Sequence, residues 1–283
     1  MRFALNLPNF GDFAEPDTLV DLARRAEAAG WDGFFLWDHI RGGDWTGPVA
    51  DPWVALAAVA AATERLTLGT MITPLPRRRP TTLARQTVTL DHLSKGRLVL
   101  GVGIGWPRDT DFSDLGDSGD DRVRAAQLDE GLAVLTGLWS GEPFSFEGQH
   151  YHIRDTRFLP PPRQQPRIPV WVAGGWPYLR PLRRAARWDG LVPLAHDPET
   201  DFRPPTPQEV AQMMAYIRRH RDPAAPFDVV VGDSLSVPGP PAAEIVGPYA
   251  AAGATWWMES IGWPLQPYEF WPEYVSAGPP RLD

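Results

Sequence analysis

The sequence predicts an α/β fold, a (β/α)8 barrel of eight parallel strands with an insertion around residues 140–165, in a single domain spanning 1–283. Two observations lead to this prediction. Short apolar runs that end near glycine or proline alternate with segments of helical periodicity, and about eight such pairs follow one another. The chain of 283 residues is also 43% hydrophobic, which is enough for the core of a barrel of this length.

The first half of the chain shows the alternation most clearly. The first predicted helix stops at Gly30, a typical C-cap, and the second carries Pro52 in its first turn. In chain order the predicted elements are the strand Phe3–Leu7, the helix Asp17–Ala29, the strand Gly33–Trp37, the helix Asp51–Thr63, the strand Leu66–Ile72, the helix Thr81–Leu93 and the strand Arg97–Gly103.

The second half contains the insertion. Residues Phe144–Ile153 alternate around Gly148 like a small hairpin, and Asp155–Pro169 is proline-rich irregular chain. The other elements, which continue the alternation, are the helix Asp121–Leu138, the strand Pro169–Ala173, the helix Leu179–Trp188, the strand Gly190–Leu194, and then Pro207–Arg219, Phe227–Ser236, Ala242–Ala252, Ala254–Glu259 and Pro267–Val275.

Composition limits the function classes. A net charge of −8 argues against binding to nucleic acid, and no apolar stretch is long enough to span a membrane. The absence of cysteine excludes disulfides, iron–sulfur clusters and thiol catalysis. The amino-terminal stretch lacks the pattern of a secretion signal. We therefore expect a cytoplasmic protein whose partner is a small molecule.

Polar and glycine residues follow the strands at the rim where barrels bind ligands. Asp38 and His39 come directly after the second strand; histidine can act as an acid or base, although a purely structural Asp-His pair is an equal alternative. In the run Gly101-Val-Gly103-Ile-Gly105-Trp106, Gly101 and Gly103 begin like a dinucleotide fingerprint, but Trp106 stands where the third glycine belongs. The better interpretation is a backbone held close to a flat ligand, with Trp106 as one wall.

Two further glycines and several arginines invite a phosphate site. Gly174 and Gly175, after the fifth main strand, could present backbone amides to a phosphate. The tract Arg77-Arg78-Arg79 could contact an acidic cofactor tail, but we expect it to be a solvated loop. For the arginines that begin the next helix, Arg180, Arg183 and Arg184, we also expect solvation.

The remaining signals are aromatic and imidazole groups. Trp37, Trp106, Trp176 and Trp263 all fall near predicted carboxyl ends of strands, which suggests a flat aromatic pocket. His150 and His152 could share a metal, but no third ligand accompanies them, so we expect no metal site. No nucleophile-elbow or phosphate-loop motif is present.

Several segments resemble the bacterial-luciferase-like family of flavin- and deazaflavin-dependent oxidoreductases. The resemblance is carried by LGTMITPLPRRRPTTLARQTVTLDHLSKGRLVLGVGIGW, AEAAGWDGFFLWDHI, DPWVALAAVAAATERLTLGT, FLPPPRQQPRIPVWVAGGW, RRAARWDGLVPL and ATWWMESI. It implies a TIM barrel that binds FMN or coenzyme F420 at the carboxyl rim, often as a homodimer.

The resemblance also implies roles for individual residues. Asp38 is similar to the acid beside the deazaflavin ring, and His39 to the catalytic histidine of F420-dependent glucose-6-phosphate dehydrogenases. Thr70-Met71 stands where such enzymes have a cis peptide bond backing the ring. The cofactor-binding residues so implied are Asp38, Thr70, Met71, Thr73, Gly103, Gly105, Ala173, Gly174 and Gly175.

One position departs from those dehydrogenases. Their glutamate after the fourth strand has no clean match in Gly105-Trp106-Pro107-Arg108-Asp109, which leaves open both a sugar-phosphate substrate and an acid role for Asp109. We place Trp37, Trp106, Asp109 and Trp176 at the substrate pocket. The expected function is an F420-dependent oxidoreductase that transfers hydride between the cofactor and a small organic substrate. An FMN-dependent monooxygenase and a non-catalytic cofactor-binding barrel are the alternatives.

Overall fold

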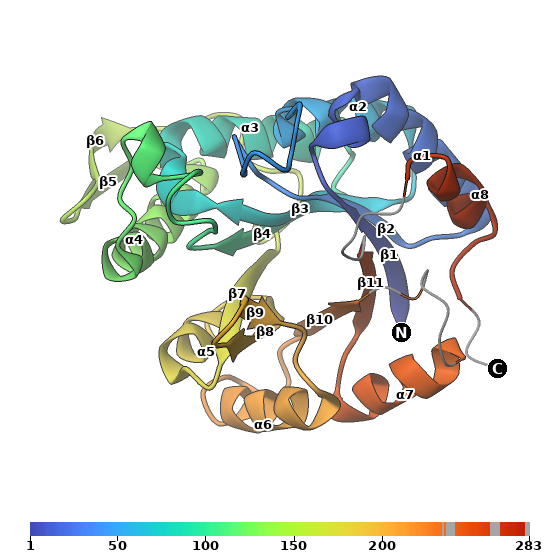
Figure 1. Ribbon diagram of the computed structural model, residues 1–283. Coiled ribbons are helices and arrows are strands. Elements are labelled where there is room, and N and C mark those ends of the chain that lie inside the picture. The colour runs from blue at the N-terminus through green and yellow to red at the C-terminus, as the bar shows by residue number, and fades with distance from the viewer. Residues whose placement is uncertain (234, 236–240, 261–266, 281–283) are drawn as a thin grey trace.

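Eight parallel strands close into a barrel in the computed structural model, which describes residues 1–233, 235, 241–260 and 267–280 (Figure 1). Neighbouring strands follow the order β10-β11-β1-β2-β3-β4-β7-β8, and a pairing of β8 with β10 closes the ring. This confirms the predicted barrel. The strands are β1 (Arg2–Leu7), β2 (Gly33–Leu36), β3 (Thr67–Pro74), β4 (Leu98–Gly103), β7 (Val170–Trp176), β8 (Gly190–Asp197), β10 (Asp228–Asp233) and β11 (Trp256–Ser260).

The helices lie outside the ring of strands (Figure 1). Their ends follow local chemistry: Gly30 ends α1 in the left-handed region, the Asp51 carboxylate accepts the first amides of α2, and Thr206 with Glu209 forms a capping box on α6. The helices are α1 (Pro16–Ala29), α2 (Pro52–Ala62), α3 (Pro80–Leu93), α4 (Asp121–Trp139), α5 (Leu179–Ala185), α6 (Pro207–Arg218), α7 (Ala242–Ala252) and α8 (Phe270–Ser276), with short 3-10 turns at Gly11–Ala14, Leu75–Arg77 and Ser113–Leu115.

Large side chains fill the inside of the barrel. The Phe35 ring stacks on Trp171 with centroids 5.5 Å apart, and Trp171 meets Trp256 edge-on at 5.4 Å. Ala4, Val99, Val230 and Met258 complete this inner cluster. The barrel is therefore a packed core rather than a pore.

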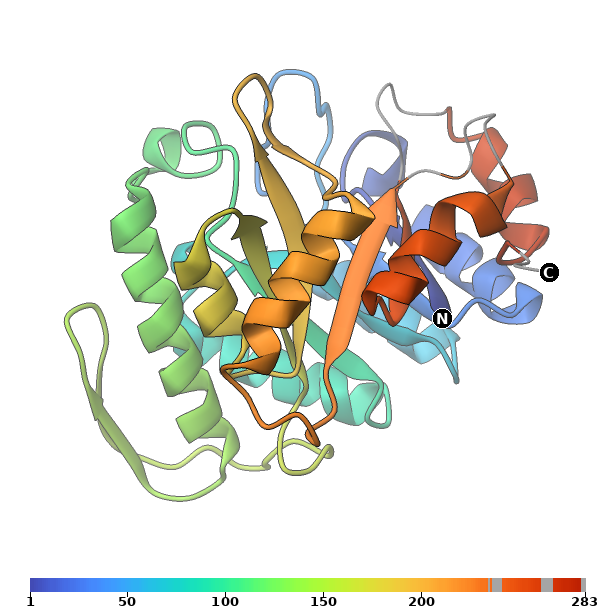
Figure 2. The ribbon, with the colours of Figure 1, turned by 90° about the horizontal axis from the view of Figure 1, so that it is seen from below.

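One edge of β8 has two partners. Near its start, Gly190 pairs in parallel with Asp228 of β10, whereas its end pairs antiparallel with β9 (Asp201–Arg203). The strand is longer than the predicted Gly190–Leu194 because this hairpin extends it beyond the barrel (Figure 2). The β8–β9 hairpin thereby becomes a wall at the carboxyl end of the barrel.

The predicted insertion is also confirmed. Strands β5 (Phe144–Glu147) and β6 (His152–Thr156) form a separate antiparallel hairpin that extends from the barrel (Figure 2). The Glu130 carboxylate on α4 accepts hydrogen bonds from the backbone amides of Gln149, His150 and Tyr151. This fixes the turn of the hairpin against the helix.

Two local predictions need correction. The cis peptide bond lies between Met71 and Ile72, one residue beyond the predicted Thr70-Met71. It falls where the register of β3 against β4 shifts, between Thr70 and Thr73. The helix predicted at Leu179–Trp188 ends earlier, at Ala185. The end of the predicted Phe227–Ser236 strand and Trp263 lie outside the described residues. No described helix has the length and apolar character needed to cross a membrane.

Candidate active site

A cavity of about 780 Å³ opens at the carboxyl ends of the barrel strands. The loops after β2 and β4 and the β8–β9 hairpin gather at this end of the molecule (Figure 2). Met71 and Met258 contribute apolar surface from the strands, and five aromatic residues line the cavity: Phe10, Trp37, Trp45, Trp106 and Phe202. A mostly apolar pocket at this rim is the usual form of a small-molecule site.

The four predicted pocket residues divide into two pairs. Trp37 and Trp106 line the cavity, and the Trp106 indole donates a hydrogen bond of 3.2 Å to the Asp201 carboxylate, joining the loop after β4 to β9. Trp176 does not line it, because strand alternation turns this side chain outward onto the core beneath the helices. Asp109 is exposed, and its carboxylate accepts a hydrogen bond from the adjacent Thr110 amide.

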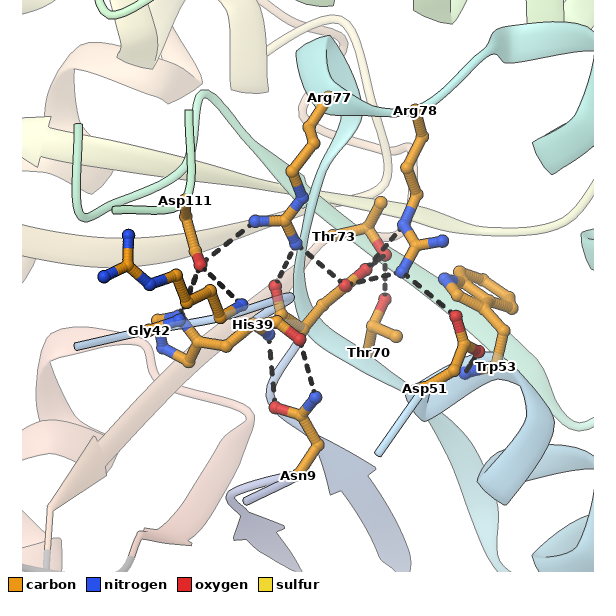
Figure 3. A network of polar contacts seen from close by, with 12 residues as sticks. Asn9, His39, Gly42, Asp51, Trp53, Thr70, Thr73, Arg77, Arg78 and Asp111 are labelled. Atoms are coloured by element: carbon orange, nitrogen blue, oxygen red, sulfur yellow. Dashed lines mark hydrogen bonds and ion pairs between the residues drawn. The ribbon is translucent and has the colours of Figure 1, made fainter. Parts of the chain in front are cut away.

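The Asp38 carboxylate is bound by the side chains of Thr73, Arg77 and Arg78, which Figure 3 labels. This carboxylate has no exposed surface and accepts two hydrogen bonds from Arg78, of 2.6 and 2.9 Å. Arg77 and the Thr73 hydroxyl donate to the same carboxylate at 3.1 and 3.0 Å. Asp38 does not line the cavity, so in this arrangement it organises the wall behind the cavity.

The expectation that Arg77 and Arg78 are solvated is wrong. Only 3% of the Arg77 side chain and 18% of the Arg78 side chain are exposed. Arg77 donates to both Asp38 and Asp111, and so joins two buried carboxylates. Buried anions need such cationic partners, and this explains why the arginines turn inward.

His39 forms a dyad with Asp111, a residue that the sequence did not reveal. The imidazole Nδ1 lies 2.8 Å from Asp111 Oδ2, and only 12% of the histidine side chain is exposed. The ring packs edge-on against Phe10, Trp37 and Trp45, with centroids 5.9 to 6.3 Å away. Among the described residues nothing bonds to Nε2. The imidazole thus stands behind aromatic residues that line the cavity.

Asp111 is a strongly stabilised carboxylate. Burial by itself would raise its pKa, but hydrogen bonds from His39 and the backbone amides of Gly42 and Arg41, together with the charge of Arg77, hold the pKa well below its usual range. An ionised partner of this kind fixes the orientation of an imidazole and stabilises its protonated form.

The backbone of His39 is fixed as well. The Asn9 side-chain amide donates to the carbonyl oxygens of His39 and Ala50 at 2.8 and 2.6 Å, while Asn9 Oδ1 accepts the His39 amide at 3.1 Å. Asn9 is fully buried and was also missed from the sequence. Its partners are 30 and 41 positions away in the chain, so no local pattern could reveal them.

The predicted cofactor-binding glycines differ in their surroundings. A Cβ on Gly103 would come within 2.0 Å of the Ile72 side chain, and Gly105 has a positive φ of 85° with the Phe112 ring close by. Protein packing therefore accounts for both. A Cβ on Gly174 would meet Leu191 at 2.8 Å, whereas at Gly175 the nearest atoms are 3.9 Å away.

The other predicted cofactor-binding residues also differ in whether they are packed inside the protein or border the cavity. Thr70 and Thr73 are fully buried, with their hydroxyl oxygens 2.7 Å apart, and only Met71 of this segment lines the cavity. Ala173 is half-buried beside Gly103.

Metal-ligating side chains do not gather into a cluster in the described ranges. No group of three or more His, Asp and Glu side chains there is placed to hold a metal ion. His152 lies 2.8 Å from Glu147 on the exposed hairpin, and His150 uses its backbone amide to bond Glu130.

The sequence profile of the luciferase-like monooxygenases matches residues 1–244. The chain belongs to this family. An F420-dependent glucose-6-phosphate dehydrogenase of Intrasporangium calvum is 37% identical over 188 residues, covering 62% of this chain and 53% of the relative. One of Microbacterium testaceum is 30% identical over 201 residues, covering 65% and 54%. The chain thus spans about half the length of these relatives.

Solved structures share the fold. An F420-dependent secondary alcohol dehydrogenase in complex with an F420-acetone adduct superposes with a TM-score of 0.76 at 17% identity, covering 97% of both chains. A monooxygenase from Streptomyces bottropensis gives 0.74 at 20% identity, covering 97% of this chain and 96% of the other. At such identities the likeness establishes the barrel architecture.

Proposed function

We propose that this protein is an F420-dependent oxidoreductase that transfers hydride between the cofactor ring and a small organic substrate. The carrying observation is the His39–Asp111 dyad, with its second imidazole nitrogen unbonded within the described chain, behind an apolar cavity at the carboxyl rim. The dehydrogenases to which the chain is similar are named as F420-dependent, which supports this choice of cofactor.

The residues around the cavity fit a flat heterocyclic ring. Met71 and Trp37 offer apolar surface to its faces. Asn6 also lines the cavity, and its buried Oδ1 accepts no hydrogen bond from any described group, so it could accept one from a ring N–H. Gly175, which has free space beside it, could let a phosphate approach the backbone. The bound cofactor would supply the site that gives or takes hydride.

His39 would handle the proton. If Nδ1–H donates to Asp111, the Nε2 atom keeps its lone pair and can take a proton from a substrate hydroxyl, or return it to a substrate oxygen. Asp111 stays ionised and would stabilise the imidazolium formed in the first direction. The aromatic residues in front of the dyad would exclude water from the reacting groups.

A cofactor titration tests the proposal. F420 and FMN are each titrated into the full chain while tryptophan fluorescence and melting temperature are followed. We expect micromolar binding of F420 and far weaker binding of FMN. Tight binding of FMN without binding of F420 would replace the proposal by the monooxygenase alternative. A stable F420 complex that no substrate pool reduces or oxidises would favour a non-catalytic binding barrel.

The variant His39→Ala tests the proton-transfer role. It should bind F420 with nearly unchanged affinity, because the residue packs behind the aromatic wall, but turnover should fall by about 10²–10⁴-fold. His152→Ala, on the exposed hairpin, is the matched control and should retain wild-type turnover. Equal turnover in both variants would remove His39 from the mechanism.

We also propose a homodimer that forms through α2. All eleven residues of this helix, PWVALAAVAAA, are apolar, and Val54 on its outer side is 68% exposed. A helix that is apolar all round is normally covered on every side. The cytoplasmic location remains a prediction from composition.

A further inference from the structure

The charges around the cavity decide which substrates it can accept. Arg203 is the one cation among the described residues that line it. Among the residues outside the description (234, 236–240, 261–266 and 281–283), Arg281 is the one Lys, Arg or His in the sequence. Binding of an anionic substrate therefore depends on whether the charge of Arg203 is neutralised by a partner.

Arg203 forms an ion pair with the carboxylate of Glu209. Its two terminal nitrogens donate to the two oxygens of Glu209 at 2.9 and 2.8 Å, and one of them also donates to the Pro204 carbonyl. Glu209 begins α6, where the Thr206 amide and hydroxyl also bond to it. The bidentate pair fixes the guanidinium and cancels its charge.

The pair stays ionised over the whole working range of pH. The side-chain hydrogen bond from Arg203, with the Thr206 amide, lowers the pKa of Glu209 to about 2 despite its partial burial. The other described carboxylate that lines the cavity, Asp233, adds a negative charge. A phosphate dianion would find no net positive charge there.

The neighbouring arginines are also paired with carboxylates. Arg77 and Arg78 are buried against Asp38 and Asp111. On the rim loops, Arg41 pairs with Asp114 and Arg108 with Asp121. These ion pairs leave the aromatic walls as the main recognition surface of the cavity.

We propose that the substrate which shares this cavity with the cofactor is an uncharged, largely apolar alcohol or carbonyl compound. The Arg203–Glu209 ion pair determines this specificity, because it prevents phosphorylated substrates from binding. This deepens the proposed function and depends on it for the reaction, but the selectivity for uncharged molecules can be measured without turnover. The aromatic residues bind the apolar substrate by contact with its surface. A sugar phosphate needs a cation to bind its phosphate, and the neutralised Arg203 does not provide one.

The variant Glu209→Gln provides the test. Glutamine can still complete the capping box on α6, but it leaves the Arg203 charge uncompensated. Glu244→Gln is the matched control, because it removes the same charge from the first turn of the neighbouring helix α7, where Glu244 is exposed. Glucose 6-phosphate and cyclohexanol are titrated into the apo-protein and the F420 complex of all three proteins by calorimetry.

Wild type and Glu244→Gln should bind cyclohexanol and give no saturable signal with glucose 6-phosphate. Glu209→Gln should bind glucose 6-phosphate at least about tenfold more tightly than wild type, with cyclohexanol affinity unchanged. Saturable binding of glucose 6-phosphate to wild type, or equal phosphate affinity in Glu209→Gln, would overturn the inference. Absence of F420 binding would instead contradict the proposed function, and the apo-protein titrations would still decide the substrate class.

Discussion

Asp38 and His39 are adjacent in the chain, but their side chains have different partners and different surroundings. Asp38 has no exposed carboxylate surface and is bound by two arginines and a threonine, which is the structural alternative considered for the pair. His39 lies behind the cavity wall with one nitrogen on Asp111, the orienting carboxylate on which its proposed acid–base role depends. At the scale of the residue, the two neighbours therefore have different surroundings: protein groups bind the Asp38 carboxylate, and of the two the proposed proton transfer depends on His39 alone.

Asp111 should also carry much of the stability of the site. The variant Asp111→Asn keeps the shape of the side chain but removes an anion from Arg77, whose side chain is 3% exposed. We expect a loss of about 3 kcal/mol in the free energy of unfolding at pH 7, at the low end for a broken buried pair because Asp38 still contacts Arg77. Urea denaturation of the wild type and the variant measures this difference in the free energy of unfolding.

The pH dependence of that loss follows from the direction of the pKa shift. Because the folded state lowers the pKa of Asp111, its stabilising contribution is complete above the unfolded value of about 4 and disappears as the pH falls toward the folded value. The gap between wild type and Asp111→Asn should therefore be smaller below about pH 4 than at pH 7. Asp117→Asn, at an exposed position, should show no gap at either pH.

At the scale of the element, periodicity was sufficient for nearly the whole barrel. The strands and helices predicted from apolar spacing lie within a few residues of those observed, since each buries a continuous face. Errors arose where tertiary pairing acts: β8 is lengthened by its hairpin with β9, and the cis bond lies in the segment where β3 shifts register against β4. Neither depends on the local sequence alone.

Two glycines on strands should respond differently to alanine. A Cβ on Gly69 would lie 1.9 Å from the backbone carbonyl of Val99, so Gly69→Ala must displace β3 from β4 and should cost about 1–3 kcal/mol or more. Gly175→Ala meets nothing closer than 3.9 Å and should keep its stability, yet weaken F420 binding if the cofactor approaches that backbone. Thermal melts and F420 titrations separate the two effects. Wild-type F420 affinity in Gly175→Ala would exclude Gly175 from the cofactor site.

At the scale of the whole molecule, the barrel joins residues that the chain keeps far apart. His39 and Asp111 are separated by 72 positions, and Arg77 reaches Asp38 across 39. The sequence predicts Asp109 at the substrate pocket and a solvated arginine tract, and it assigns no role to Asp111. Only closure of the strands decides which acid is buried and which arginine must neutralise it. The rim could be predicted, but its polar network could not.

The apolar outer side of α2 leads to the last prediction, which concerns assembly. If two chains pair through this helix about a two-fold axis, every substitution there enters the interface twice. Sedimentation equilibrium should give twice the chain mass of 31.4 kDa for wild type and the monomer mass for Val54→Glu combined with Ala61→Glu. Leu115→Glu, which places the same charge on an exposed apolar residue of the loop after β4, should remain a dimer. A wild-type protein that stays monomeric at high concentration would contradict the proposed interface and leave the exposed Val54 without a partner.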